Sequence, residues 1–304
     1  MKLVENEFIK FMEKFDENPF RIILDDGEHL IGDGEPAFTV KINKIPKMMD
    51  MLTSTSITLG EAYMNGDIEI EGDLYTALNM FLGQMGKFST DTKKLKNIIF
   101  TSKSKANQKK EVSSHYDIGN DFYKMWLDET MSYSCGYFKN ENDTLYQAQC
   151  NKVDRILEKL NLSDGMTLCD IGCGWGFLLI EAAKKYNIKG VGITLSKEQK
   201  AKFEQRIKEE NLSDRLEVKL LDYRDLPKQH MEFDRVVSVG MIEHVGRGNY
   251  EEFMQCVKSV LKQGGVFVLH FISALKEYPG DAWVKKYIFP GGVIPSLREI
   301  MQIA

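Results

Sequence analysis

A glycine-rich turn near the middle of the chain has the residue types of a ligand-binding loop. The apolar run that starts at Thr167 reaches Asp170, and Gly172, Gly174 and Gly176 follow at alternate positions. Glycine permits a tight turn and lets a ligand approach the backbone closely. The dinucleotide-binding pattern is GxGxxG, whereas here the third glycine comes one residue early. This spacing is weak evidence for a dinucleotide. Asp170, two residues before the first glycine, favours as ligand a nucleoside that carries an amino acid rather than a pyrophosphate.

Three other positions carry side chains that could take part in a reaction: a thiol, a carboxylate and an imidazole. Cys135 lies in YSCGYF, Glu243 in GMIEHVG and His270 near the end of an apolar run. Taken alone, a cysteine is more often a small buried hydrophobe, and Glu243 would serve as a carboxylate at a helix start. A histidine inside an apolar strand is by default a core residue with satisfied hydrogen bonds. Only the surrounding motifs raise these three residues above those interpretations.

The elements that must position these residues alternate regularly from about Thr167 onward. Short apolar runs, typical of buried strands, alternate with amphipathic stretches of helical periodicity. This alternation predicts an α/β domain with a parallel, doubly wound sheet. Ligands of such sheets bind at the carboxyl ends of the strands. The predicted helices are Phe177 to Tyr186, Lys197 to Asn211 and Tyr250 to Leu261, and the strands are the runs MTLCDIG, GVGITL, LEVKLLD, FDRVVSVG and GVFVLHFI.

The composition is that of an ordinary soluble globular protein. The 304 residues give a prior of about two domains. Hydrophobic residues make up 43% and charged residues 28%, which excludes collagen-like and disordered classes. The formal net charge is −5, so the overall field does not favour a nucleic acid as partner.

The cysteines and the apolar runs of the sequence together predict a cytoplasmic protein. Five cysteines without a CxxC pair indicate neither a disulfide framework nor a metal site, and they are typical of the reduced cytosol. The amino-terminal phenylalanines recur at helical spacing with acids between them, unlike a signal peptide. The longest apolar-rich stretch, Gly265 to Ser273, is too short to span a bilayer. Any membrane contact is therefore expected to be peripheral.

Residues 1–85 are predicted to form a small α+β domain. A helix is expected from about Val4 to Asp16, strands at Phe20 to Leu24 and Phe38 to Ile42, and further helices near Ile45 and Leu74. The stretch ITLGEAYMNGDIEIEGDLYTAL resembles the end of a sterol-carrier-like fold, which implies a lipid-associating module. Nothing in this domain has a catalytic signature.

Residues 86–111 form a basic linker in the sequence. Eight lysines stand against two acids, a local charge of +6. Composition alone favours a solvated or disordered linker. The alternative is a polybasic segment attracted to anionic lipid, where each cation near the surface contributes about 1 kcal/mol. The residues are Lys87, Lys93, Lys94, Lys96, Lys103, Lys105, Lys109 and Lys110, against Asp91 and Glu111.

DIGCGWG resembles the cofactor loop of S-adenosylmethionine-dependent methyltransferases. The second strand of that superfamily usually ends in an acid, whereas this chain has the segment ITLSKEQ. Together with HYDIGNDFY (115–123), MSYSC (131–135), GMIEHVG (240–246) and YIFPGG (287–292), this segment resembles the cyclopropane fatty acid synthases and their mycolic-acid relatives. The resemblance spans Val112 to Ser296, so residues 112–304 are expected to form a Rossmann-like methyltransferase domain.

The resemblance implies two groups of site residues. The first would hold S-adenosylmethionine: Tyr133, Ser134, Asp170, Gly172, Gly174, Gly176, Thr194, Leu195, Ser196, Gln199, Asp222, Tyr223 and Arg224. The second would hold a bicarbonate ion that acts as base: Cys135, Glu243, His270 and Ile272. Several aromatic residues are either ordinary core residues or walls of an acyl-chain tunnel, namely Tyr116, Phe122, Tyr123, Trp126, Tyr137 and Trp283.

The implied reaction adds a methylene group to the cis double bond of an unsaturated phospholipid acyl chain. The partners would be such chains at a membrane surface, met peripherally from the cytoplasmic side, and a homodimer is left open. Two alternatives remain: a methyltransferase of the same superfamily that leaves a methyl branch or acts on another group, and a lipid- or cofactor-binding protein without turnover. The superfamily sheet has two further strands after the fifth, so the sequence is expected to be a truncated piece of a longer chain.

Overall fold

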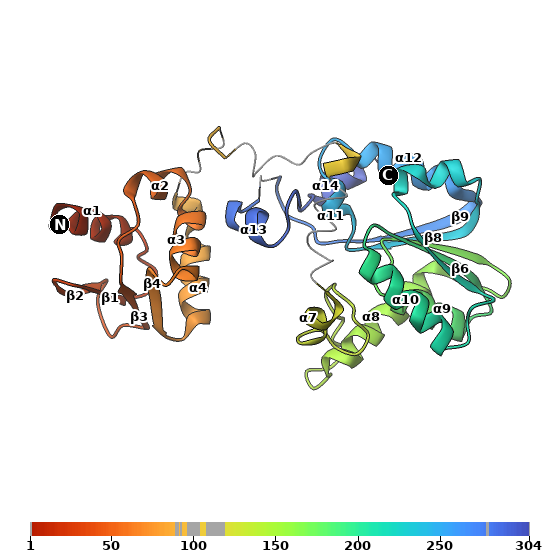
Figure 1. The fold of residues 1–304 in the computed structure, drawn as a ribbon, viewed down its shortest axis with the longest axis horizontal. Coiled ribbons are helices and arrows are strands. Elements are labelled where there is room, and N and C mark those ends of the chain that lie inside the picture. Colours follow the sequence, from red (N-terminus) through yellow and green to blue (C-terminus); the bar gives the residue numbers. More distant parts are fainter. Residues whose placement is uncertain are drawn as a thin grey trace. The chain divides into compact units, whose positions relative to one another are not determined.

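The computed structural model describes residues 2–88, 91, 93–95, 104–107, 119–277 and 280–303 (Figure 1). The chain divides into two compact units. One comprises Met1–Phe100 together with Asp281–Ile288, and the other comprises Thr101–Gly280 together with Phe289–Ala304. The second unit carries all the residues for which the sequence predicts a chemical role.

The amino-terminal unit is a four-stranded sheet with helices. Its elements are α1 (Lys2–Met12), β1 (Phe20–Leu24), β2 (Gly27–Ile31), β3 (Phe38–Ile42), α2 (Met48–Thr53), α3 (Thr55–Met64), β4 (Ile68–Gly72), α4 (Leu74–Gly83) and the 3-10 turn η1 (Met85–Lys87). The strand order is β2-β1-β3-β4, with β1 and β3 parallel and the outer pairs antiparallel. The two predicted strands are confirmed at the predicted residues.

Two predicted helices of this unit differ from the observed ones. The helix α1 ends at Met12 rather than Asp16, because the chain turns there and places the Phe15 ring, which is 0% exposed, in the core. The helix α2 begins at Met48 rather than near Ile45, and Pro46 explains the delay. The residue before a proline is disfavoured in helical geometry.

A helix from the far end of the chain completes this unit. The helix α13 (Ala282–Tyr287) contacts α3: a Cβ built on Gly60 would lie 2.4 Å from Cδ1 of Trp283, and the hydroxyl of Tyr287 donates to Glu61 Oε1 at 2.8 Å. Ala282 shares a buried apolar cluster with Ile57. Trp283 therefore packs as a core aromatic residue of the amino-terminal unit.

The second unit confirms the predicted parallel, doubly wound α/β fold. Its five strands in the described residues are ordered β7-β6-β5-β8-β9, and all neighbours are parallel. The order reverses between β5 and β8, which is where ligands bind in such sheets. Its elements are α7 (Asn120–Lys124), α8 (Leu145–Leu160), β5 (Thr167–Ile171), α9 (Phe177–Lys185), β6 (Lys189–Thr194), α10 (Lys197–Glu209), β7 (Leu216–Leu220), η2 (Tyr223–Gln229), β8 (Phe233–Val239), α11 (Ile242–Val245), α12 (Tyr250–Val260), β9 (Leu261–His270) and α14 (Leu297–Met301).

Helices cover both faces of this sheet. On one face α8, α9 and α10 pack through Leu157, Leu179 and Phe203, and on the other α12 and η2 pack through Phe253 and Leu226. Adjacent residues of β5 point to opposite faces of the sheet: Leu168 packs in the core on the α9 side, and Cys169 packs in the core on the α12 side. Burial on both faces explains why the strands read as continuous apolar runs.

The strand β9 pairs with β8 through an irregular register that sets the end of the sheet. Phe233 pairs with Leu261, but Arg235 pairs with Val266, so β9 carries extra residues at its start. After this irregularity the pairing is regular, and Val239 lies opposite His270. The Gly240 N–H donates to the His270 carbonyl at 2.9 Å, which fixes the residues that follow both strands.

The helix α8 begins with a reciprocal cap that offers a stability test. Thr144 Oγ1 accepts from the Gln147 N–H at 3.2 Å, and Gln147 Oε1 accepts from the Thr144 N–H at 2.7 Å. We expect Thr144→Ala to lower the free energy of unfolding by about 1 kcal/mol. Thr144→Ser retains the capping hydroxyl and should unfold like the parent in urea. Equal unfolding midpoints for the alanine and serine variants would contradict this account.

The basic linker lies mostly outside the described residues. Of its described lysines, Lys87 pairs with Asp16, Lys94 with Asp91 and Lys105 with Asp225. These three charges are partly balanced within their own unit, so attraction to a lipid surface stays a prediction. Among the helices of the described residues, none is long and apolar enough to cross a bilayer.

Candidate active site

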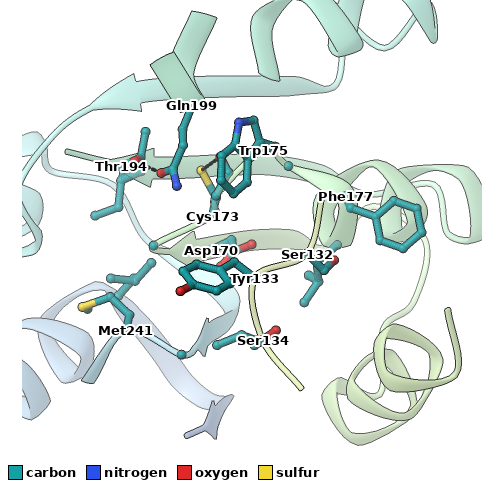
Figure 2. A pocket seen from close by; sticks show the side chains of 18 of the residues that line it. Ser132, Tyr133, Ser134, Asp170, Cys173, Trp175, Phe177, Thr194, Gln199 and Met241 are labelled. Atoms are coloured by element: carbon teal, nitrogen blue, oxygen red, sulfur yellow. Dashed lines mark hydrogen bonds between the residues drawn. The ribbon is translucent and has the colours of Figure 1, made fainter. Parts of the chain in front are cut away.

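A cavity of about 150 Å³ lies at the carboxyl ends of β5, β6 and β8, beside the point where the strand order reverses (Figure 2). The loops after these strands form its floor, and the segment 130–134 forms another wall. The predicted cofactor residues that line it are Tyr133, Ser134, Asp170, Gly172, Gly174, Gly176, Thr194, Leu195, Gln199, Asp222, Tyr223 and Arg224. Twelve of the thirteen are therefore brought together.

The glycine turn is shaped for a close approach to the backbone. Gly172, Gly174 and Gly176 have φ values of 85°, 55° and 85°, in the left-handed region that favours glycine. The N–H groups of Gly172 and Cys173 both donate to the Ile193 carbonyl at 3.0 Å, which joins the turn to β6. A helix begins directly after the turn, at Phe177.

Asp170 ends β5 as a buried carboxylate with unused hydrogen-bonding capacity. Its side chain is 3% exposed, and its Oδ1 has no hydrogen-bond partner among the described residues. Burial raises the pKa of Asp170 to about 7, while the charge of Lys152 lowers it. Buried carboxylate oxygens are seldom left unpaired, so this oxygen is available to a ligand that donates hydrogen bonds.

Asp170→Asn tests that role. Because a hydrogen bond to a charged group contributes about 1.5 to 3 kcal/mol, we expect affinity for S-adenosylhomocysteine to fall roughly tenfold to hundredfold in titration calorimetry. Asp164→Asn makes the same change at an exposed position in the turn before β5 and should bind like the parent. Unchanged affinity in Asp170→Asn would remove Asp170 from the binding site.

The segment after β6 forms a small hydrogen-bonded network at the cavity. Thr194 Oγ1 donates to Gln199 Oε1 at 2.7 Å and accepts from the Ser196 N–H at 3.2 Å. Figure 2 shows Gln199 and Thr194 facing one another above the glycine turn. Ser196 is 0% exposed and is absent from the cavity lining, and its Oγ accepts from the Gln199 N–H as the cap of α10. The structure thus gives Ser196 a supporting position behind the lining.

In the segment after β7, Asp222 and Arg224 form an ion pair with each other. Arg224 donates to both carboxylate oxygens of Asp222, at 2.8 and 2.6 Å, so their charges are largely balanced. The ring of Tyr223 stacks edge to face on Phe253, and burial raises the pKa of its hydroxyl. That hydroxyl has no partner among the described residues.

The wall at 130–134 is held by two polar residues of α8 that the sequence analysis missed. Gln149 Nε2 donates to the Ser134 carbonyl at 2.8 Å, and Lys152 Nζ donates to Ser134 Oγ at 2.7 Å. Both side chains are about 95% buried or more. The signal was present in the sequence: both lie on the buried stripe of an amphipathic helix, where apolar residues are expected. Met131 in this wall has a φ of 58°, a strained backbone of the kind that occurs at functional sites.

The four predicted base-site residues form two contacts near the carboxyl ends of β8 and β9. Cys135 Sγ lies 3.9 Å from His270 Nε2, and the Ile272 N–H donates to Glu243 Oε1 at 2.7 Å. Glu243 Oε2 and His270 Nδ1 are buried without partners among the described residues. The alternative interpretation of Glu243 is a carboxylate near the start of the helix at Tyr250; the structure places it instead in the first turn of the short helix α11, before α12 begins.

Electrostatics set the protonation of this second group. Burial raises the pKa of Glu243 above its ordinary value, and the Ile272 N–H opposes that shift. Burial lowers the pKa of His270, and the charge of Lys152 lowers it further. The imidazole is therefore neutral near pH 7, with one nitrogen that can accept a proton.

Aromatic rings cluster beside the Tyr133 wall. The Tyr133 ring lies 5.0 Å from Trp126, 5.7 Å from Tyr123 and 6.1 Å from Phe289. Tyr123 is buried, whereas Phe122, Trp126 and Tyr137 are between 38% and 45% exposed. Residues 115–118, the first four of the nine in the HYDIGNDFY motif and among them Tyr116, lie outside the described residues. The described part of that motif contributes Asn120, whose Oδ1 accepts from Trp175 Nε1 at 2.6 Å.

Two family models match the chain. The model described as mycolic acid cyclopropane synthetase matches residues 103–304. A model described as a domain of unknown function matches residues 8–93, which assigns no role to the amino-terminal unit. The predicted likeness of that unit to sterol carriers stays a prediction.

Curated relatives align over most of the chain. A probable fatty acid methyltransferase of Pseudomonas putida is 38% identical over 300 residues, covering 93% of this chain and 73% of the relative. The cyclopropane-fatty-acyl-phospholipid synthase of Escherichia coli K12 is 40% identical over 258 residues, covering 83% of this chain. The chain spans 65% of that enzyme's length.

Solved structures share the fold of the second unit. A cyclopropane synthase from Mycobacterium tuberculosis matches with a TM-score of 0.60 and 35% identity, covering 64% of this chain and 72% of that chain. A mycolic acid cyclopropane synthase in complex with SAH and CTAB matches with a TM-score of 0.60 and 34% identity, over 64% and 72% of the two chains. Coclaurine N-methyltransferase, at 24% identity, 70% and 69% coverage and a TM-score of 0.52, shares the fold alone.

Proposed function

This chain belongs to the mycolic acid cyclopropane synthetase family of S-adenosylmethionine-dependent methyltransferases, and we propose that it converts cis double bonds of phospholipid acyl chains into cyclopropane rings. One observation carries the proposal. Two sets of buried polar atoms, Asp170 Oδ1 in one and Glu243 Oε2 with His270 Nδ1 in the other, have no partner among the described residues and lie at the ends of neighbouring parallel strands. The first set suits a methyl donor and the second suits a base.

The residues present fit S-adenosylmethionine. Its ammonium group would donate to Asp170 Oδ1, and its methionine part would lie against the glycine turn, where three residues have no side chain of their own. The Thr194 and Gln199 pair would face the ribose, with Tyr223 at the adenine side. When bound, S-adenosylmethionine supplies a methyl group on a good leaving group, which a weakly nucleophilic alkene requires.

The residues present also fit a small oxyanion such as bicarbonate. Glu243 Oε2 and His270 Nδ1 are buried and have no partner within the described part of the chain, so this group can orient a bound ion. Ile272 offers less than the resemblance implies, because its N–H already donates to Glu243. When bound, bicarbonate supplies the base that accepts a proton from the newly added methyl group.

Between methyl transfer and proton removal, residues of this chain would protect the positively charged intermediate. Methylation of one alkene carbon leaves a positive charge on its neighbour, which aromatic faces stabilise and water would destroy. The cluster of Tyr133, Trp126 and Phe289 provides such faces beside the cavity. Neutral His270 and Glu243 Oε2, which no described residue contacts by a hydrogen bond, would hold the base within reach of the new methyl group, so that the ring closes as the proton leaves.

The test is a lipid assay with labelled donor. Vesicles that contain unsaturated phospholipid are incubated with the protein and methyl-labelled S-adenosylmethionine, and the acyl chains are analysed by mass spectrometry and gas chromatography. The proposal expects a gain of one methylene and the retention time of a cyclopropane fatty acid. No mass gain, with the donor shown by calorimetry to bind, would favour a binding protein without turnover.

A methyl-branched product is the second candidate. It is favoured by the Pseudomonas putida relative, whose description is a probable fatty acid methyltransferase rather than a cyclopropane synthase. Both products require the same donor and the same carbocation, and they differ in how the charge is relieved. Gas chromatography separates the ring from the branch.

We place the reaction at the inner face of the cytoplasmic membrane, with the protein attached peripherally. The substrate class and the basic composition of residues 86–111 support this placement. Flotation with anionic liposomes at low salt should carry the protein upward, and high salt should release it. A homodimer is part of the same proposal, and sedimentation at several protein concentrations tests it.

A further inference from the structure

The proposed base site has no positive charge among the residues that the family resemblance supplies. Cys135 contributes a thiol, Glu243 a carboxyl group and Ile272 backbone atoms. His270 is neutral near pH 7, because burial and a nearby lysine lower its pKa. An anion in a partly buried site is costly unless a cation or several donors face it. A cation is therefore expected near this group from elsewhere in the fold.

Lys152 is the cation that the fold brings to this place. Its side chain, 5% exposed, lines the cavity from α8, and its Nζ donates to Ser134 Oγ at 2.7 Å. Ser134 is followed in the chain by Cys135, whose Sγ lies 3.9 Å from His270 Nε2. The charge of Lys152 lowers the pKa of His270, and the Cys135 thiol counteracts the lowering of the Lys152 pKa, in keeping with the short path through Ser134.

The ammonium of Lys152 is not consumed by its protein contacts. It carries three N–H donors, and Ser134 accepts one of them. No ion pair joins Lys152 to a carboxylate within the described residues, and its interactions with Asp128 and Asp170 are longer-range attractions. Arg224 also lines the cavity, but its guanidinium group forms an ion pair with the Asp222 carboxylate at 2.6 Å. Burial lowers the pKa of Lys152 only to about 8, so at pH 7 most molecules keep the charge.

We propose that Lys152 is an anion-binding residue of this active site, whose ammonium holds bicarbonate beside Cys135 and His270. This inference rests on the proposed function, because it names the charge partner of the same base site. It also gives different partners to two charges: Asp170 and Lys152 both line the cavity, whereas Cys135, Glu243 and His270 are not part of its lining. Asp170 would face the ammonium of the methyl donor, and Lys152 would face the bicarbonate, so that each buried charge has an opposite partner.

The experiment measures bicarbonate binding without relying on turnover. The protein is saturated with S-adenosylhomocysteine in buffer freed of carbon dioxide, and its thermal unfolding midpoint is followed as sodium bicarbonate replaces sodium chloride at constant ionic strength. A ligand that binds the folded state raises the midpoint with its concentration. The parent should show this rise. In Lys152→Met the concentration needed for the same rise should increase at least about tenfold, since a hydrogen bond to a charged group is lost.

Three further variants make the result specific. Lys152→Gln keeps a donor for Ser134 without the charge and should lose bicarbonate binding as Lys152→Met does, which keeps the test decisive if the methionine variant fails to fold. Lys152→Arg keeps the charge and should restore part of the binding. Lys208→Met removes an exposed lysine of α10 and should behave like the parent. If Lys152 had only a structural role, bicarbonate binding would not depend in this way on the charge at position 152.

Two results would overturn the inference. They are equal bicarbonate binding by the parent and by folded Lys152→Gln, and no bicarbonate binding by the parent. The lipid assay on the parent is judged separately. If the parent forms cyclopropane while the Lys152 variants bind bicarbonate normally, only this inference fails. If the parent neither binds S-adenosylhomocysteine nor changes the lipid, the proposed function fails.

Discussion

Glu243→Gln should lower cyclopropane formation by about 10²- to 10⁴-fold, the range over which a positioned proton-transfer group contributes. Glutamine can still accept from the Ile272 N–H, as Glu243 Oε1 does at 2.7 Å. Its second polar atom, however, is an NH₂ donor, whereas the native Oε2 is a buried acceptor with no partner in the described part of the chain. The variant therefore keeps the local fold and loses the acceptor that the base site needs.

The measurement for Glu243→Gln has two parts. Initial rates of product formation from labelled donor and unsaturated phospholipid vesicles give the activity, and calorimetry with S-adenosylhomocysteine shows that the donor site is intact. Glu251→Gln, an exposed change on α12, is the matched control and should leave both values unchanged. If Glu243→Gln kept more than about a tenth of the parent rate, its proposed role in the base site would be wrong.

Gly176→Ala is expected to have the largest effect on stability. A Cβ at this position would lie 2.0 Å from Cδ2 of Phe203, whose ring is fully buried in the core under α9 and α10. The position also has a φ of 85°. Overpacking costs about 1 to 3 kcal/mol and a left-handed non-glycine residue about 1 to 2, so a loss of about 3 kcal/mol is expected.

Gly174→Ala is the control within the same turn. Its φ is 55°, but nothing lies within 4 Å of a Cβ built there. Only the backbone term applies, and the expected loss is about 1 kcal/mol. Urea unfolding of the two variants and the parent measures the difference. Equal destabilisation would show that the Phe203 ring yields to the added methyl group and that packing does not select glycine at position 176.

The sequence was most informative where the physics is local. Asp170 and the three glycines were identified as a ligand loop because strand, turn and helix follow one another without a break, and the structure places all four in the cavity lining. The helices α9, α10 and α12 begin at the predicted residues, since their apolar faces repeat with helical periodicity. The assignment to the cyclopropane synthase family is confirmed by the family model.

Long-range contacts explain what the sequence did not reveal. Lys152 looked like one of forty lysines and arginines, and only the packing of α8 shows that it enters the cavity. Ser196 matched a cofactor motif, yet its hydroxyl is used to begin α10. The N–H of Ile272 is occupied by Glu243, which lies 29 positions earlier. None of these partners could be chosen from spacing along the chain.

The helix α13 has a consequence for how the protein is made. Its residues Ala282–Tyr287 complete the unit that otherwise consists of the first hundred residues. During synthesis Ile57 and the surface around Gly60 stay uncovered until residue 288 has left the ribosome. The two units are therefore not separable at a single position in the gene. Removing the first hundred codons would leave α13 without the surface that buries Ala282, so a catalytic unit expressed alone would have to be redesigned at both junctions.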